Sequence, residues 1–447
     1  MLSVKRKKFG AKDKQMKRTV LILLIAAIPA IDLIQAQKIL TLRECYEKAM
    51  ISNPIAGEKE AYASIWQLKD KNLSKAWLPT LDANGNFLYN SKVVDLSYLF
   101  ESLPIPGLAD ATPLMPHDQY KITMDINQVI YDGGAIRSMK DLEKAELSIN
   151  QKQTEADLYK LRGQINNYYF TLILLEKQKE LLNSYLELIN KRIISLQSAL
   201  ANGVIIKADI DVMNSEKIKI TQQLNENEIL KDSILKILSD LTGLEIDVST
   251  EFLLPAIPGE MTREISRPDL ELFDLRRDQL TAGLKVIESK RLPKAFGFAS
   301  LGYGNPPGSD FFRDEFDTYY IVGASIKWNI FDWNKTKNEK KLISVQQNII
   351  ENRKSDLTDI LTRQLDAKTA EIAKLSSMLE SDTALIDIRK RITASAESQY
   401  ENGTITATEL LNEMNSERQA MINYEIHKIN LVMAKIEYLN ISGKEIE

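Results

Sequence analysis

The feature that most constrains the fold is an internal duplication. Short motifs recur in the same order at nearly constant offsets of 214 and then about 200 residues. The matched pairs are Asn53-Pro54 with Arg267-Pro268, Leu78-Pro79 with Leu292-Pro293, Tyr89 with Tyr303, Tyr131-Asp132 with Phe331-Asp332, and Asn202-Gly203 with Asn402-Gly403. An ordered series of this kind predicts two copies of one unit. We place the first copy at 37–243, a linker at 244–266 and the second copy at 267–447.

Each copy is expected to contain one very long helix. In the first copy the range 135–201 holds no proline and only one glycine, Gly163. Apolar residues within it alternate three and four positions apart, which is typical of a coiled-coil seam. At 1.5 Å per residue this helix spans ~100 Å. The opening helix at 42–77 and the return helix at 204–242 are each about half as long, so we expect both to pack end to end beside it.

The second copy repeats this pattern, with a long helix at 334–401 and a return helix at 405–441. Between the opening helix and the long helix, each copy has two segments that alternate apolar and polar residues, as half-buried strands do. The four strands are predicted at about 81–93, 120–131, 295–303 and 319–331. No amphipathic helix is left to cover their apolar faces, so lipid or another subunit is expected to do so. A soluble two-layer sheet is the alternative.

Four strands cannot close a barrel, because about eight is the lower limit. Closure therefore requires further copies of the chain. The predicted fold is mainly α, with long antiparallel coiled-coil helices and a membrane β-barrel that several protomers complete. The strand count does not by itself set the number of copies.

The first 36 residues have the composition of a secretory signal peptide. Eight lysines and arginines lie between 5 and 18, an apolar run follows from Val20 to Ile31, and Ala36 precedes a polar segment. Met16 begins a more typical signal and is an alternative start. We expect cleavage after Ala36 and no lipid on Cys45; an uncleaved membrane anchor is the alternative.

Composition excludes several classes of function. The chain has one cysteine and two histidines, His117 and His427, which lie far apart in the sequence. Neither a disulfide framework, a metal site nor a histidine-dependent catalytic centre is expected. Beyond residue 36 there are 50 basic and 60 acidic residues, a balance opposite to that of nucleic-acid binders. We therefore expect no catalytic residues, no cofactor, no metal and no nucleic acid.

A set of short motifs covers nearly the whole chain after residue 36. They are Leu40 to Cys45, Asn53-Pro54, the two Leu-Pro pairs, the strand-to-helix switch from Gln128 to Gly134, and the Asn-Gly turns. In these motifs and their order the chain resembles the TolC family of bacterial outer-membrane efflux proteins. The second copy departs from the pattern at one switch, where Asp332-Trp333-Asn334 replaces Asp-Gly-Gly.

The resemblance implies a homotrimer, with a 12-stranded barrel in the lipid of the outer membrane and an α-helical tunnel through the periplasm. Segments 94–119 and 304–318 would then face outside the cell. A periplasmic adaptor protein would dock at the opposite tip, and an inner-membrane pump of the RND or ABC type would supply substrate. The turns at Asn202, Gly203, Asn402 and Gly403 would form that docking tip.

The resemblance also implies a closable constriction near the tip. Acidic residues would ring the pore at Asp209, Glu409 and Glu413, and Tyr400 would help to hold it shut. Ile405 occupies the position where a basic partner is expected, so that ion pair is predicted to be absent. The alternative is that these acids are solvated charges near helix N-termini, where negative charge is favourable.

The resulting functional prediction is a passive exit duct of a tripartite efflux or type I secretion system. One alternative is a structural coiled-coil scaffold of the cell envelope. A second is a secreted enzyme on an all-α frame, for which no catalytic cluster is visible in the sequence. Drugs, metal ions and proteins all remain open as the exported substrate.

Overall fold

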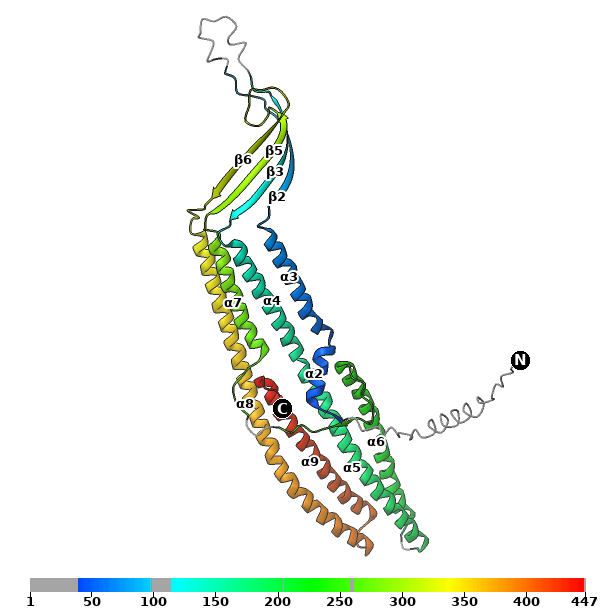
Figure 1. Ribbon diagram of the computed structural model, residues 1–447. Coiled ribbons are helices and arrows are strands. Elements are labelled where there is room, and N and C mark those ends of the chain that lie inside the picture. The colour runs from blue at the N-terminus through cyan, green and yellow to red at the C-terminus, as the bar shows by residue number, and fades with distance from the viewer. Residues whose placement is uncertain (1–38, 97, 99–113, 204, 258–260, 446–447) are drawn as a thin grey trace, which may run out of the picture.

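The computed structural model describes residues 39–96, 98, 114–203, 205–257 and 261–445. The predicted signal peptide, much of segment 94–119, and Pro258 with Gly259 of the linker lie outside these ranges. The described chain is a long rod (Figure 1). A four-stranded sheet forms one end, and helices run from it to two neighbouring turns at the other end.

The sheet combines the strands of both copies. It contains β2 (Thr80–Tyr89), β3 (Asp118–Tyr131), β5 (Lys294–Asn305) and β6 (Asp317–Lys327), all antiparallel in the order β2-β3-β5-β6. The four strands were predicted, but two of their ends were wrong.

The ends of β2 and β6 are set by their neighbours. Strand β2 stops at Tyr89, short of the predicted 93, because its partner β3 begins opposite it at Asp118. Strand β6 stops at Lys327, short of 331, because its partner β5 begins at Lys294. The residue before Lys294 is Pro293, which has no N–H to extend the ladder.

The opening helix was predicted as one piece over 42–77 and is in fact broken. It consists of α2 (Leu42–Ser52), a 3₁₀ turn η1 (Pro54–Gly57) and α3 (Glu58–Lys75). The break falls at Asn53, which is extended because the following proline disfavours a helical conformation there. The side chain of Asn53 then accepts a hydrogen bond from the N–H of Ile55 and caps η1.

The first long helix is also divided, with α4 (Ala135–Tyr159) followed by α5 (Leu161–Ala201). The intervening residue, Lys160, keeps helical dihedral angles, so the chain continues in nearly the same direction. The corresponding helix of the second copy, α8 (Lys335–Glu401), runs 67 residues without interruption. Its length of ~100 Å is the one predicted for both copies.

Shorter helices pair with the long ones as expected. The return helices are α6 (Lys207–Thr242) and α9 (Ala407–Ser442), and the second opening helix is α7 (Pro268–Ser289). Helix α8 packs against α7 in the half near the sheet and against α9 in the other half. The two copies also interleave, because α4 contacts α7 and α5 contacts α9.

The core is divided along the rod. One cluster lies at mid-height around Tyr169, Leu172 and Leu238, where β1 (Ile39–Leu40) pairs in parallel with β4 (Glu251–Phe252). A second cluster, around Ile189 and Met213, joins the helix hairpins near the turns. Most apolar residues of the seam predicted within 135–201 are buried in these two clusters, whereas Ile206, which directly precedes α6, is exposed.

Candidate membrane interface and helix-tip site

One face of the sheet is apolar across all four strands. Residues that lie directly opposite in neighbouring strands share a face, and the register aligns Leu81, Ile126, Ala299 and Val322 in one such row. The large side chains of this face each expose between 42% and 79% of their surface. They are Leu81, Phe87, Tyr120, Ile122, Met124, Ile126, Leu301, Tyr303, Tyr320, Val322 and Ile326. Within the described residues, no helix covers this face (Figure 1).

Aromatic residues border the apolar face at both ends. At the end far from the helices, ring centroids lie 4.9 Å apart for Phe87 and Tyr120 and 5.7 Å apart for Tyr303 and Phe316. At the helix end, Trp328 and Trp333 are exposed. Aliphatic residues fill the band between them. Aromatic girdles around an apolar band are typical of sheets that span a bilayer.

The length of the strands fits the same interpretation. Strand β6 has 11 residues, which at ~3.3 Å per residue and a tilt of ~40° gives a height of about 28 Å. The hydrocarbon core of a bilayer is ~30 Å thick. In the part of the chain that the structure describes, no helix is both long and apolar enough to cross a membrane.

The opposite face of the sheet is more polar, although Leu88, Phe298 and Ile321 also lie on it. Asp125 lies near its centre and accepts hydrogen bonds from Asn84 Nδ2 at 2.7 Å, Thr123 Oγ1 at 2.9 Å and Ser300 Oγ at 2.5 Å. These contacts join three strands through side chains. Such a face is suited to water, whereas the other is suited to lipid.

At the far end of the rod the α5–α6 and α8–α9 turns lie close together (Figure 1). Gly203 and Gly403 adopt φ angles of 69° and 71°, which favour glycine. Each follows an asparagine, Asn202 or Asn402, whose amide donates to a serine carbonyl at 3.0 or 2.8 Å and caps the helix. A Cβ atom on either glycine would meet no described atom within 4 Å. The space beside both glycines is therefore open among the described residues.

The structure supplies a basic residue that the sequence interpretation missed. Arg192 of α5 extends toward α8, where its Nη2 lies 2.6 Å from Glu397 Oε1 and its Nη1 lies 3.8 Å from Glu401 Oε1. Ile405 was predicted to leave the tip without a basic partner, but Arg192 provides an ion pair to α8 from the other copy. In the sequence Arg192 directly precedes Ile193, a buried residue of the predicted seam, and this position beside the seam could have indicated a contact with another helix.

Tyr400 packs into the core cluster between the two hairpins. Its hydroxyl is buried and has no hydrogen-bond partner among the described residues. Burial raises the pKa of this phenol and the charge of Asp209 raises it further, while Arg192 acts in the opposite direction. Tyr400, Asp209 and Arg192 therefore lie near one another where the hairpins meet.

The two other predicted pore acids have partners within the protomer. Glu409 forms a capping box with Thr406, whose N–H and hydroxyl lie 2.7 and 3.0 Å from Glu409 Oε2. These bonds lower the pKa of Glu409. Glu413 forms an ion pair at 3.2 Å with Arg389 of α8. Both acids remain on one face of α9, but neither is an isolated charge.

A second cross-hairpin network lies further from the turns and was also missed. Arg418 of α9 contacts the buried Glu216 of α6 at 3.5 Å, and its guanidinium lies 4.8 Å from the ring centroid of Tyr185 on α5. It also donates to Asn415 Oδ1 at 2.9 Å. Glu216 and Asn415 lie in a short sequence, Met-Asn-Ser-Glu, that begins at Met213 and recurs at Met414.

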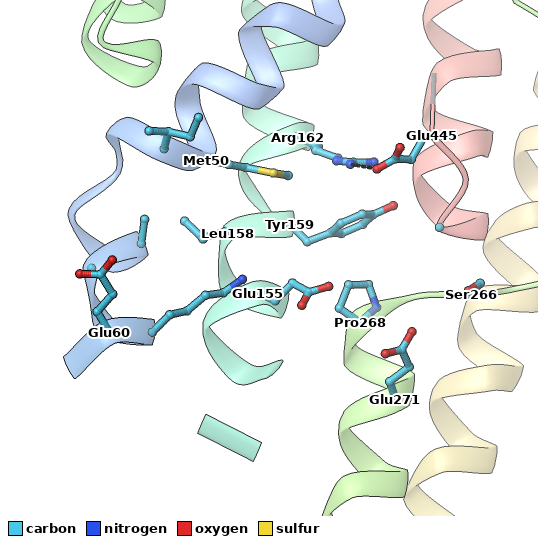
Figure 2. A pocket seen from close by; sticks show the side chains of 15 residues that line it. Met50, Glu60, Glu155, Leu158, Tyr159, Arg162, Ser266, Pro268, Glu271 and Glu445 are labelled. Carbon is cyan, nitrogen blue, oxygen red and sulfur yellow. Dashed lines mark ion pairs between the residues drawn. The ribbon is translucent and has the colours of Figure 1, made fainter. Parts of the chain in front are cut away.

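A cavity of about 600 Å³ lies at mid-height, where the second copy meets the first (Figure 2). Arg162 is buried beside it, with its guanidinium 5.1 Å from the ring centroid of Tyr46 and 4.6 Å from that of Tyr159. It forms an ion pair with Glu445 at 3.6 Å. Pro268, at the start of α7, forms the opposite wall. The contacts of Arg162 hold α2, the α4–α5 junction and the segment after α9 together.

The remaining polar groups of interest are candidate metal ligands and His427. In the described ranges, no three His, Cys, Asp or Glu side chains are placed to hold a metal ion. His427, for which no metal-binding or catalytic role was expected, has its Nδ1 2.6 Å from Asp382 Oδ2 of α8. This contact ties α9 to α8 in the middle of their hairpin.

Solved structures of known proteins share this fold. A structure of CusC, described for its transmembrane channel formation, has a TM-score of 0.67 at 11% identity and covers 90% of this chain and 92% of its own. The outer membrane protein VceC of Vibrio cholerae gives 0.64 at 14% identity, covering 91% and 97%. The open MtrE outer membrane channel of Neisseria gonorrhoeae gives 0.62 at 13%, covering 91% and 89%.

The sequence itself matches no family model and no curated protein. The structural similarity nevertheless extends over about nine-tenths of the chain. The protein therefore has the fold of the outer membrane channels, as the resemblance in its motifs indicated.

Proposed function

We propose that this protein is an outer-membrane channel of the TolC family, which serves as the passive exit duct of a tripartite efflux or type I secretion system. The observation that carries the proposal is the uncovered apolar band between two aromatic borders, continuous with helices ~100 Å long. The band fits a bilayer, and the helices reach away from it far enough to cross a periplasm. The duct itself makes and breaks no bonds and uses no cofactor.

The same surface argues for a homotrimer. Strands β2 and β6 are the edges of the sheet and leave backbone groups unpaired, which is unfavourable in lipid. Below them, α3 exposes Ile65 and Leu68, and α8 exposes Leu342 and Val345. These are the two outer helices of the layer α3-α4-α7-α8.

One edge of the sheet is β2 and the other is β6. Because the two edges differ, copies of the chain would join head to tail, and such contacts can close into a ring. Pairing β6 with β2 of the next copy would join α8 to α3 in the same step. Three copies would supply 12 strands, enough to enclose an aqueous channel whose wall is the polar face that carries Asp125.

The open turns at Gly203 and Gly403 are proposed to receive a periplasmic adaptor protein, which would connect the duct to an inner-membrane RND or ABC pump. The constriction is proposed to lie beside these turns. There the pair between Arg192 and Glu397, together with the packing of Tyr400, would hold the hairpins of each protomer together. Asp209, Glu409 and Glu413 would then give the entrance a negative lining.

Planar-bilayer recording tests the proposal directly. Detergent-extracted full-length protein should insert and give discrete, long-lived conductance steps that prefer cations. A coiled-coil scaffold would give no steps. To test docking, cysteine at Ile206 would be labelled with a photo-crosslinker in the native host. The native Cys45 is buried and should not compete for the label. The expected product is a covalent adduct with an adaptor protein, and labelling that yields no adduct would contradict docking at this turn.

A further inference from the structure

A basic cavity lies directly below the sheet, on the side of the helices. Its volume is about 620 Å³, and it is lined by the end of α7 and the start of α8. Four basic side chains, Arg291, Lys337, Lys340 and Lys341, share the lining with one acid, Glu288. Lys340 pairs with Glu288 at 2.6 Å. Among the described residues, the other three cations have no ion pair within 4 Å, but Arg291 also interacts electrostatically with the nearby Asp332. The excess of positive charge therefore lies mainly at Lys337 and Lys341.

The fold does not require this excess. The first turns of a helix disfavour positive charge because of the helix dipole, yet α8 begins with several lysines. At the equivalent place in the first copy, Arg137 and Lys140 match Lys337 and Lys340, and Lys140 is neutralised by Asp70 at 3.2 Å. Trp77 and Asp141 stand where the second copy has Arg291 and Lys341. The same turn therefore forms with two of the four cations.

The cavity adjoins the apolar face of the sheet. Trp328 directly follows β6 and continues the every-second-residue pattern of Tyr320, Val322 and Ile326. Its indole Nε1 donates a hydrogen bond to the carbonyl of Arg291 at 3.0 Å. The guanidinium of Arg291 in turn donates to the carbonyl of Ile330 at 3.3 Å. Arg291 thus connects the aromatic border of the sheet to the cavity.

The backbone of Trp333 is strained at the same border. It adopts a φ of 53°, where the first copy has Gly133 at 69°. A bulky residue in this conformation is unfavourable, and the cap that Asp332 provides for α8 stabilises the turn. The side chain is 83% exposed. An indole at this height is typical of the boundary between hydrocarbon and headgroups.

We infer that the basic cavity binds the phosphate of an anionic glycerophospholipid in the leaflet next to the helices. The inference rests on the proposed membrane position of the sheet. Lys337 and Lys341 lie about 3 and 9 Å along the axis from the first residue of α8, and the headgroup layer is about 5–7 Å deep. Long lysine side chains can extend back toward the phosphates. Clusters of this kind recognise acidic lipids.

The test uses tryptophan quenching by lipids with brominated acyl chains. The parent protein carries Trp66→Phe and Trp77→Phe, so that Trp328 and Trp333 are the two indoles left of the four in the chain. The full-length oligomer is reconstituted with brominated phosphatidylglycerol or brominated phosphatidylcholine at equal mole fractions. We expect phosphatidylglycerol to be preferred about fivefold, with the preference reduced at ~1 M salt.

The variant Lys337→Gln with Lys341→Gln should lower the preference to less than about twofold. The matched control is Lys374→Gln with Lys390→Gln, which removes two exposed charges from α8 far from the sheet and should leave the preference unchanged. Inorganic phosphate, compared with chloride at equal ionic strength, should have no additional effect.

Three results would overturn the inference but not the membrane position of the protein. The first is equal quenching of the parent protein by both lipids, and the second is an unchanged lipid preference in Lys337→Gln with Lys341→Gln. The third is loss of the preference when inorganic phosphate is added, because that would indicate a site for free anions. If the parent protein shows no lipid preference and Lys337→Gln with Lys341→Gln no longer forms the trimer, the lysines serve contacts between copies instead. Quenching by neither lipid would instead refute the proposed membrane position, and the inference with it.

Discussion

Removing the cross-hairpin ion pair at the tip should open the channel. In Arg192→Gln the contact of 2.6 Å with Glu397 on α8 is lost. Two unit charges ~4 Å apart attract by about 4 kcal/mol at an effective dielectric constant of ~20. Desolvation and side-chain ordering offset most of this, because the side chains are only 15% and 35% exposed. A net contribution of about 1–2 kcal/mol per protomer remains.

In a trimer the three pairs together would favour the closed state by about 3–6 kcal/mol. A two-state channel that is closed 99% of the time becomes 99% open after a shift of about 5.5 kcal/mol. Arg192→Gln should therefore raise the resting conductance in planar bilayers several-fold or more, and Glu397→Gln should do the same. The double variant should add little, because both single changes remove one interaction.

The matched control is Lys191→Gln, on the adjacent residue. Lys191 pairs at 2.7 Å with Glu187 of its own helix, and both side chains are largely exposed. It crosses to no other hairpin, so its loss should leave the conductance unchanged. If intact Arg192→Gln oligomers conduct like the wild type, the pair does not hold the tip closed. An equal rise in Lys191→Gln would show a general effect of charge.

Glu409→Gln should weaken cation selectivity while keeping the helix cap, whereas Glu409→Ala should lose both selectivity and thermal stability; if neither changes selectivity in bilayers, Glu409 serves only as a cap. Gly403→Trp should abolish export at normal trimer yield, and Gly403→Asn, which tolerates positive φ, should preserve export; equal loss of trimer and export would assign the glycine to the turn alone. Burial raises the pKa of Tyr46 from 10.0 to about 12, so the folded state keeps a proton that the unfolded state loses. The urea midpoint should therefore fall between pH 10 and 12, and less so in Tyr46→Phe.

Sequence periodicity predicted the long helices and the four strands because both depend on a regular, local signal. The seam predicted from Leu158 to Leu200 is buried largely as its spacing indicated, except at its last residue, Leu200, which is 37% exposed. The predicted helix lengths also indicated that two shorter helices would pack along each long one. The break at Asn53 was missed because the apolar pattern continues through it, although Pro54 restricts the backbone there.

Contacts between the copies could not be predicted in the same way. Arg192 with Glu397, and Arg418 with Glu216, join helices of different copies, and no spacing within one helix specifies which pairs will meet. At the strand-to-helix switch of the second copy, Asp332-Trp333-Asn334, the sequence differs from the first copy but the backbone geometry does not. Trp333 and Asn334 adopt the left-handed conformation of Gly133 and Gly134 despite their side chains, because Asp332 caps α8 as Asp132 caps α4. The surrounding fold therefore determined the backbone conformation of this turn more strongly than the conformational preferences of its residues did.

The central claim is that this chain completes its sheet only with copies of itself in a membrane. Native mass spectrometry of the full-length protein, extracted from the outer membrane in mild detergent, tests it most directly. The account predicts a single closed species of three chains that shows no monomer until it is denatured. A well-folded, monodisperse monomer with the same sheet would contradict it, because β2, β6 and the apolar face would then be stable without a partner.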